Sequence, residues 1–232
     1  MSKEVKNIII TGVSRGIGYE LFKLFVKEGH RVLGVSRNLD PLQPIVKEFE
    51  NASILSIDIS KEEELQKVKS FVEKNWQKVD VLIHNAGKLL NKPFTKTSTT
   101  DFMEVYKVNV FAVAELTRVL LDYFSVDSHV VAISSMGGIQ GSMKFPGLVA
   151  YSSSKGAVIT LMELLAEEFK DKKIACNTLA IGAVQTEMLA EAFPDYKAPV
   201  TAKEMALYIK DFALKGHKYY NGKVLQVSSS TP

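Results

Sequence analysis

Short apolar runs alternate with segments of helical periodicity along the whole of this 232-residue sequence. Such alternation is typical of β-α-β units, in which the strands pair in parallel and helices cover both faces of the sheet. The sequence therefore predicts an α/β fold with a doubly wound parallel sheet of about seven strands, formed by a single domain over residues 1–232. The expected strands are Asn7–Thr11, Arg31–Ser36, Ser53–Asp58, Val79–His84, His129–Ser134, Ile174–Ala180 and Lys223–Val227, and the expected helices begin near Gly16, Pro41, Ser60, Thr99, Tyr151 and Thr201.

The segment after the third expected strand illustrates the helical pattern. Ser60 and Glu63 have the spacing of a capping box, which predicts the start of a helix at this point. Leu65, Val68 and Val72 then recur at helical spacing. We expect this apolar face to pack in the core and not to line a cofactor site.

The charge and composition of the chain indicate which kinds of binding partner to expect. The formal net charge is +3, with Lys and Arg spread along the chain, so no nucleic-acid partner is expected. Cys176 is the only cysteine and the histidines show no ligand spacing, so we expect neither a disulfide nor a metal site. No apolar stretch has the length of a membrane span and the first residues lack a signal-peptide layout, so we expect a cytoplasmic protein with no membrane partner.

The first expected strand leads into a glycine-rich turn and then into an amphipathic helix. The Gly-x3-Gly-x-Gly spacing of the turn lets the backbone fold tightly and approach a pyrophosphate closely. The start of the helix supplies free N–H groups and partial positive charge. A strand, a turn and a helix in this order therefore predict a dinucleotide site. The residues expected to contact the dinucleotide here are Gly12, Ser14, Arg15, Gly16, Ile17 and Gly18.

Several further motifs follow along the chain, most of them near the end of an expected strand or the start of an expected helix. They are Asp58–Ile59, His84–Asn85–Ala86–Gly87, Asn109, Ser135, Tyr151 with Lys155, Gly182 and Thr186. Together with the glycine turn, this series resembles the short-chain dehydrogenase/reductase family from about residue 7 to residue 190. The resemblance implies a Rossmann-type oxidoreductase that transfers a hydride between a nicotinamide cofactor and a carbonyl or alcohol. It also implies cofactor contacts from Asp58, Ile59, Asn85, Ala86, Gly87, Tyr151, Lys155, Gly182 and Thr186.

The resemblance further implies roles for four catalytic residues. Tyr151 is expected to act as the general acid in reduction, with Lys155 one helical turn away lowering its pKa and holding the nicotinamide ribose. Ser135 is expected to donate a hydrogen bond to the substrate oxygen, and Asn109 to position a water between Lys155 and solvent. An unperturbed tyrosine has a pKa of about 10, and an exposed ion pair supplies only about 1 kcal/mol or less. We therefore expect a partly dry site and a bound cofactor to be needed as well.

The residues after the second expected strand bear on the choice of nicotinamide cofactor. An NAD site usually has an acidic residue here, which binds the ribose hydroxyl, whereas this sequence has Ser36 and Arg37. Arg15 is expected nearby, and two guanidinium groups favour the 2′-phosphate of NADP(H). Allowing for solvent exposure, we expect a preference for NADP(H) of about ten- to a hundredfold.

The catalytic hydroxyl is one place where the sequence departs from the family pattern. Ser135 lies 16 positions before Tyr151. The loop between them is about three residues longer than is usual in the family, an extension that costs little closure entropy. Ser135 is the expected hydroxyl, with Ser134 and Ser142 as alternatives.

Three departures lie further along the chain. Ile181–Gly182 replaces the Pro-Gly that is common after the sixth strand, and the expected lid, from Glu187 to Pro199, is short. Ser228–Ser229–Ser230 stands where many members have Asp-Gly-Gly, which weakens the expectation of tetramer contacts through the last strand. The apolar residues of the lid are Met188, Leu189, Phe193 and Tyr196.

The leading hypothesis is the NADPH-dependent reduction of a small aldehyde, ketone or related carbonyl. Two alternatives stay open: a sensor or scaffold that binds NADP(H) without chemistry, and an NAD-dependent alcohol dehydrogenase. The expected partners are a small-molecule carbonyl or alcohol substrate and further copies of the chain. The family resemblance implies a homodimer or homotetramer, with a dimer contact through the helices around Asn109–Tyr123 and Tyr151–Phe169.

Overall fold

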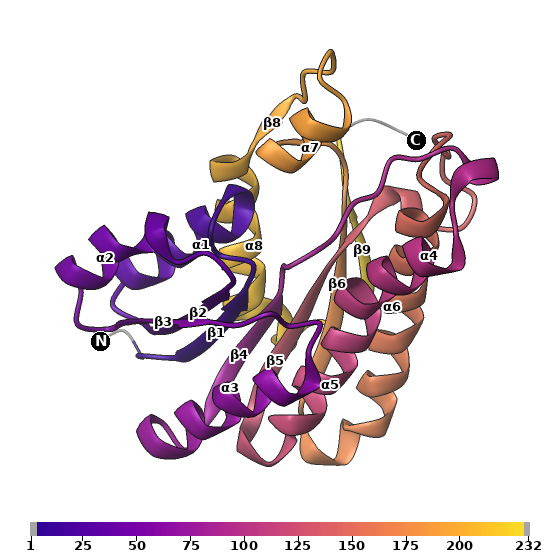
Figure 1. The fold of residues 1–232 in the computed structure, drawn as a ribbon. Coiled ribbons are helices and arrows are strands. Elements are labelled where there is room, and N and C mark those ends of the chain that lie inside the picture. The colour runs from indigo at the N-terminus through magenta and orange to yellow at the C-terminus, as the bar shows by residue number, and fades with distance from the viewer. Residues whose placement is uncertain (1–3, 230–232) are drawn as a thin grey trace.

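The computed structural model describes residues 4–229, so Met1–Lys3 of the N-terminal stretch and Ser230 of the C-terminal serine run lie outside the described residues. Seven strands form one parallel sheet in the order β3-β2-β1-β4-β5-β6-β9 (Figure 1). The order reverses between β1 and β4, which is the crevice where open α/β sheets bind ligands. The predicted doubly wound parallel sheet is confirmed. Its strands are β1 (Asn7–Thr11), β2 (Arg31–Ser36), β3 (Ala52–Ser56), β4 (Val79–His84), β5 (Phe124–Ser135), β6 (Ala175–Ile181) and β9 (Val224–Val227).

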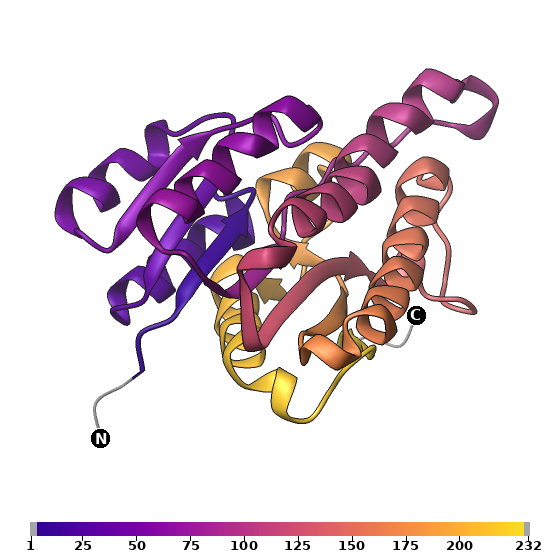
Figure 2. The same cartoon turned by 90° about the horizontal axis from the view of Figure 1, so that it is seen from below.

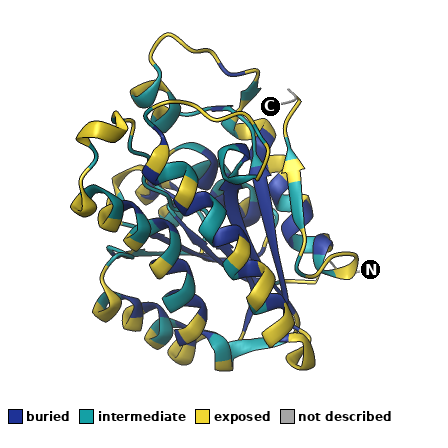
Figure 3. Ribbon diagram, turned by 90° about the vertical axis from the view of Figure 1, so that its right-hand side faces the viewer, coloured by how far each residue is buried: buried dark blue, intermediate teal, exposed yellow. Residues whose placement is uncertain are grey.

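Helices cover both faces of this sheet, and Figure 2 shows α8 and α6 on opposite sides of the strands. On β1, Ile8 and Ile10 pack with α1, α2 and α8, whereas Ile9 between them packs with α3, α5 and α6. Alternate strand residues thus enter two separate cores, and Figure 3 shows the central strands buried between exposed outer helix faces. The helices are α1 (Gly16–Lys27), α2 (Gln43–Glu48), α3 (Glu62–Asn75), α4 (Thr99–Tyr106), α5 (Ala112–Val119), α6 (Val149–Glu168), α7 (Glu187–Ala192) and α8 (Ala202–Lys215).

The capping box expected at Ser60 is absent, so that prediction is wrong. Helix α3 begins two residues later, at Glu62, and its N-cap Lys61 makes no side-chain cap. The Ser60 hydroxyl instead donates to Asp58 Oδ1 at 2.7 Å, closing a turn at the end of β3. Asp58 competes successfully for the serine because its carboxylate is a charged acceptor two residues away.

Two parts of the structure lie beyond the sequence prediction. The helix expected from Thr99 is interrupted by a π-helical turn at Lys107–Phe111, which joins α4 to α5. After β6 the chain forms α7 between two short paired strands, β7 (Val184–Gln185) and β8 (Val200–Thr201), which stand above the sheet in Figure 1. Across residues 4–229, no helix combines the length and apolar character that a membrane span requires.

Candidate active site

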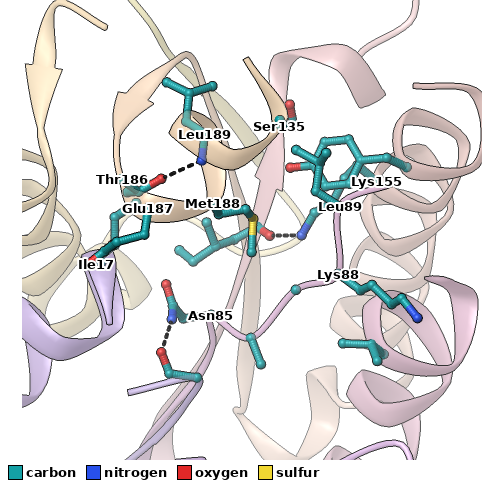
Figure 4. Close-up of a pocket in the computed structure, with 18 of the residues that line it drawn as sticks. Ile17, Asn85, Lys88, Leu89, Ser135, Lys155, Thr186, Glu187, Met188 and Leu189 are labelled. Carbon is teal, nitrogen blue, oxygen red and sulfur yellow. Dashed lines mark hydrogen bonds between the residues drawn. The ribbon is translucent and has the colours of Figure 1, made fainter. Parts of the chain in front are cut away.

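A cleft of about 1110 Å³ opens at the C-terminal ends of the central strands. Its walls are the turn after β1, the segments after β2 and β4, the end of β5 with the start of α6, and α7 (Figure 4). Every residue that the sequence indicated for the cofactor lines this cleft except Gly18, which lies directly behind the turn. The strand ends therefore bring together residues that are far apart in the sequence.

The glycine turn has no room for a side chain at two positions. Gly12 has φ +75°, and a Cβ there would lie 2.7 Å from the Ala86 Cα. A Cβ at Gly18 would lie 2.1 Å from the Gly12 carbonyl oxygen. Helix α1 starts directly after the turn with no side-chain cap from Arg15 and no acid in its first turn. Its first N–H groups are therefore left to bind an anion in the cleft.

Thr11 and Asn85 fasten this turn to the end of β4. The Asn85 amide donates to the carbonyl oxygens of Thr11 and Gly12 at 3.0 Å each, and the Thr11 hydroxyl accepts from the backbone N–H groups of Asn85 and Ala86. His84 at the first motif position points away from the cleft, because its Nε2 pairs with the Thr117 hydroxyl at 2.9 Å. Burial lowers the pKa of His84 to about 3, so this imidazole is neutral.

Tyr151 and Lys155 lie one turn apart at the start of α6. The Lys155 side chain is buried, with 6% exposure, and its Nζ donates to the Ile133 carbonyl oxygen at 2.7 Å. The same nitrogen lies 5.8 Å from the centroid of the Tyr151 ring. Burial lowers the pKa of Lys155 to about 8, which leaves it mostly protonated at neutral pH.

The Tyr151 phenol lies beside Ser135 at the end of β5. Burial raises the pKa of Tyr151, and a hydrogen bond with the Ser135 side chain offsets only part of that rise. A buried phenol resists ionisation because the phenolate is poorly solvated. The lysine one turn away does not reverse this direction. Bringing the pKa of Tyr151 toward neutrality therefore needs positive charge beyond that of Lys155.

The three candidate serines have different partners. Ser134 is buried and donates to the Lys155 carbonyl oxygen at 2.8 Å, and Ser142 donates to the carbonyl oxygens of Met136 and Ile139. Ser135 lines the cleft, where its hydroxyl accepts from the Gly137 N–H at 3.2 Å and hydrogen-bonds the Tyr151 phenol instead of a loop carbonyl. Figure 4 shows it on the same side of the cleft as Lys155. The longer loop after β5 thus leaves Ser135 as the hydroxyl facing the cleft.

Asn109 is buried in the π-helical turn beneath these groups. Its amide oxygen accepts from the Lys88 N–H at 2.8 Å, and its Nδ2 donates to the Lys88 carbonyl oxygen and to the Ser154 hydroxyl. A Cβ added to Gly87 would lie 3.6 Å from both the Asn109 oxygen and the Lys155 nitrogen, so Gly87 is flanked by the two groups. No sequence motif indicated that Lys88 and Ser154 fix Asn109.

The end of the cleft beside β2 and β3 carries two arginines and an aspartate. Burial raises the pKa of the Asp58 carboxyl, but hydrogen bonds from Ser60 and the nearby Arg37 charge bring it below its ordinary value. Arg37 and Ser36 line the cleft as expected. Arg15 lines it too, but its guanidinium is ion-paired with Glu191 of α7, a contact that the sequence did not indicate.

Helix α7 closes the cleft from above. The Thr186 hydroxyl caps it by accepting from the Leu189 N–H at 3.2 Å (Figure 4). At its other end, the Asn91 amide donates to the Ala192 carbonyl oxygen at 3.0 Å. Gly182 is held at the start of this segment by the Val227 carbonyl oxygen, 2.9 Å from its nitrogen.

Comparison with known proteins agrees with this geometry, since the model of the short chain dehydrogenase family matches residues 6–197. The chain belongs to the short-chain dehydrogenase family. Carbonyl reductase family member 4 of Xenopus laevis is 29% identical over 186 residues, which cover 80% of this chain and 78% of the relative.

The solved structures similar to this chain contain NADP in some cases and NADH in others. ElxO with NADP bound has a TM-score of 0.84 and 29% identity, over 97% of this chain and 98% of that one. A 3-ketoacyl-(acyl-carrier-protein) reductase of Brucella melitensis complexed with NADH has a TM-score of 0.86 and 25% identity, over 98% of each chain. This short-chain dehydrogenase is thus an oxidoreductase whose structural neighbours bind NADP in one case and NADH in another.

Proposed function

We propose that this short-chain dehydrogenase reduces a small aldehyde or ketone with NADPH, using Tyr151 to deliver the proton. The observation that carries the proposal is the group formed by Ser135, Tyr151 and the buried Lys155 at the C-terminal ends of the strands. A buried lysine costs stability, so its presence beside a phenol and a hydroxyl is best explained by chemistry. Binding alone has no need of such a group.

The residues of the cleft fit a dinucleotide with a 2′-phosphate. The uncapped start of α1 offers N–H groups to a pyrophosphate, and Arg37 follows β2, where an NAD site usually has an acid. Within residues 4–229, Arg37 forms no direct ion pair, and although the charge of Asp58 lies nearby, the guanidinium lines the cleft where it can meet a phosphate. NADPH, once bound, supplies the hydride, and Lys155 would hold its ribose.

The protein's own residues handle the proton. The Ser135 hydroxyl donates to the carbonyl oxygen of the substrate, where negative charge develops. Tyr151 then protonates that oxygen, because its phenol carries the proton at neutral pH. The Lys155 ammonium stabilises the phenolate left behind. Asn109, fixed by the Lys88 backbone, holds a water through which Lys155 and Tyr151 recover a proton from solvent.

The lining of the cleft beyond Ser135 supports an apolar carbonyl substrate. Its side chains are mostly hydrocarbon, and two of its charged groups, Lys88 and Glu104, pair with each other. Burial of an apolar substrate against such walls is favourable without a counter-ion. The apolar residues that line this end are Leu89, Leu90, Phe145, Leu148, Met188, Leu189, Phe193 and Tyr196.

An NADPH oxidation assay with a panel of aldehydes and diketones tests the proposal. We expect turnover with NADPH that exceeds turnover with NADH at equal concentrations. Tight NADPH binding with no turnover across the panel would instead identify a sensor or scaffold. A preference for NAD⁺ with alcohols would identify an NAD-dependent alcohol dehydrogenase.

The same proposal extends to a homodimer or homotetramer through α5 and α6. Phe111 before α5 and Leu164 on α6 are exposed, by 48% and 63% respectively. Large apolar side chains on these helices are the surface that a second copy would cover. Light scattering on the purified protein measures the assembly, and a Leu164→Lys variant should reduce its mass; a variant of unchanged mass would exclude this surface.

A further inference from the structure

Arg15 and Glu191 form a two-point contact across the mouth of the cleft. The Nη1 and Nη2 groups of Arg15 donate to the two different carboxylate oxygens of Glu191, the second at 3.1 Å. This hydrogen bonding raises the pKa of Arg15 and lowers that of Glu191. Two parallel N–H···O bonds fix the guanidinium in both position and orientation.

The contact joins the two sides of the cofactor cleft. Arg15 belongs to the glycine turn, whereas Glu191 lies near the end of α7, next to Ala192, whose carbonyl oxygen is held by Asn91 on the opposite wall. One turn earlier on α7, Glu187 lies beside the start of α1 (Figure 4), and a Cβ on Gly16 would be 3.5 Å from its carboxylate. Both acids therefore face the turn where cofactor phosphates are expected.

We infer that Glu191 is a specificity-determining residue that competes with the 2′-phosphate of NADP(H) for the Arg15 guanidinium. The inference rests on the proposed NADP(H) site. A 2′-phosphate can accept hydrogen bonds from Nη1 and Nη2 of Arg15 only after the Glu191 carboxylate has released these groups. NAD(H) has no such phosphate, so its binding leaves the pair intact. Glu191 thus reduces the preference that Arg15 and Arg37 would otherwise create.

Arg37 differs from Arg15 because, among residues 4–229, it has no carboxylate bonded to its guanidinium. In the described part of the chain no acid forms an ion pair with Arg37, and Asp58 acts on it only through its charge at longer range, so the 2′-phosphate need not displace a bonded carboxylate from Arg37. Arg15 and Glu191 remain partly exposed, with side-chain exposures of 47% and 61%, so solvent already weakens their pairing. The expected change is therefore modest, about two- to fivefold in the dissociation constant.

Dissociation constants for NADPH and NADH, measured by fluorescence titration at low salt, test the inference. Glu191→Gln and Glu191→Ala should each tighten NADPH about two- to fivefold and leave NADH unchanged. Asp195→Asn removes the same charge from an exposed residue just after α7 and should change neither constant. In an Arg15→Ala background, Glu191→Gln should have no further effect on NADPH.

An equal decrease in the dissociation constants of NADPH and NADH would overturn the inference, since it would mean that Glu191 acts only on the closure of α7 over the cleft. Weaker NADPH binding would overturn it as well, because Glu191 would then be clamping the cofactor in place. So would an unchanged constant for both Glu191 variants. The preference of the unmodified protein for NADPH over NADH tests the proposed function separately, so the two failures are distinguishable.

Discussion

The buried ammonium of Lys155 should destabilise the fold while serving the site. Its ordinary pKa of 10.5 is lowered to about 8 by burial. At about 1.36 kcal/mol for each pKa unit, keeping this group charged costs the native state about 3 kcal/mol at neutral pH. Lys155→Met removes that cost but also removes the hydrogen bond to the Ile133 carbonyl oxygen, which contributes about 1–2 kcal/mol. The variant should therefore be more stable than the unmodified protein by about 1–2 kcal/mol.

The pH dependence of this difference identifies its origin. Between the native and unfolded pKa values the unfolded chain binds more protons at Lys155, so the stability of the unmodified protein rises with pH in that window. The advantage of Lys155→Met should be fully present below about pH 8 and should shrink by about 1 kcal/mol between pH 7 and pH 9. Above pH 10.5, where Lys155 is neutral in both states, the burial cost is gone and the lost hydrogen bond should leave Lys155→Met the less stable protein.

Urea unfolding without cofactor, followed by the fluorescence of Trp76, measures both quantities. The same variant should bind NADPH more weakly and lose turnover, which separates stability from function. Lys74→Met, which removes an exposed lysine of α3, controls for the loss of one positive charge. The reasoning would be refuted if Lys155→Met were less stable than the unmodified protein at neutral pH. It would also be refuted if the difference in stability between the two proteins did not change with pH.

Two further predictions concern the cofactor and the substrate oxygen. Arg37→Asp combined with Arg15→Ala should reverse the cofactor preference in kcat/KM, because it removes the advantage of NADPH of about ten- to a hundredfold and adds a carboxylate that repels the 2′-phosphate; an unchanged ratio would show that neither arginine reads the 2′-phosphate. Ser135→Ala should lower kcat by about a hundredfold or more in steady-state assays. Ser142→Ala should leave kcat unchanged, because that hydroxyl is engaged by loop carbonyls; the reverse result for these two serines would transfer the role to Ser142.

Local sequence signals were enough to predict the sheet and its glycine turn. The apolar runs and their spacing specify strands, and the φ value of Gly12 explains why glycine stands there. Spacing alone was misleading at Ser60, because its hydroxyl donates to the Asp58 carboxylate instead of capping a helix. The choice among the serines also required coordinates, because it depends on which carbonyl each hydroxyl reaches.

The helix of the lid and its contacts were the part that sequence reasoning could not supply. Helix α7 is six residues long, too short for a clear periodic signal. Its contacts join residues 176 positions apart, as Arg15 and Glu191 show. Such pairings are set by how the segments after β1 and β6 meet above the sheet. No local pattern records them, and they decide how free Arg15 is to bind a phosphate.

The Tyr151→Phe variant tests the central claim most directly, because it removes one hydroxyl and keeps the ring. The measurement is kcat with NADPH and a turned-over carbonyl, together with the dissociation constant of NADPH. The account predicts that kcat falls by about a hundredfold or more while NADPH binding changes by less than about twofold. Undiminished turnover in this variant would contradict it and remove Tyr151 from the proton transfer.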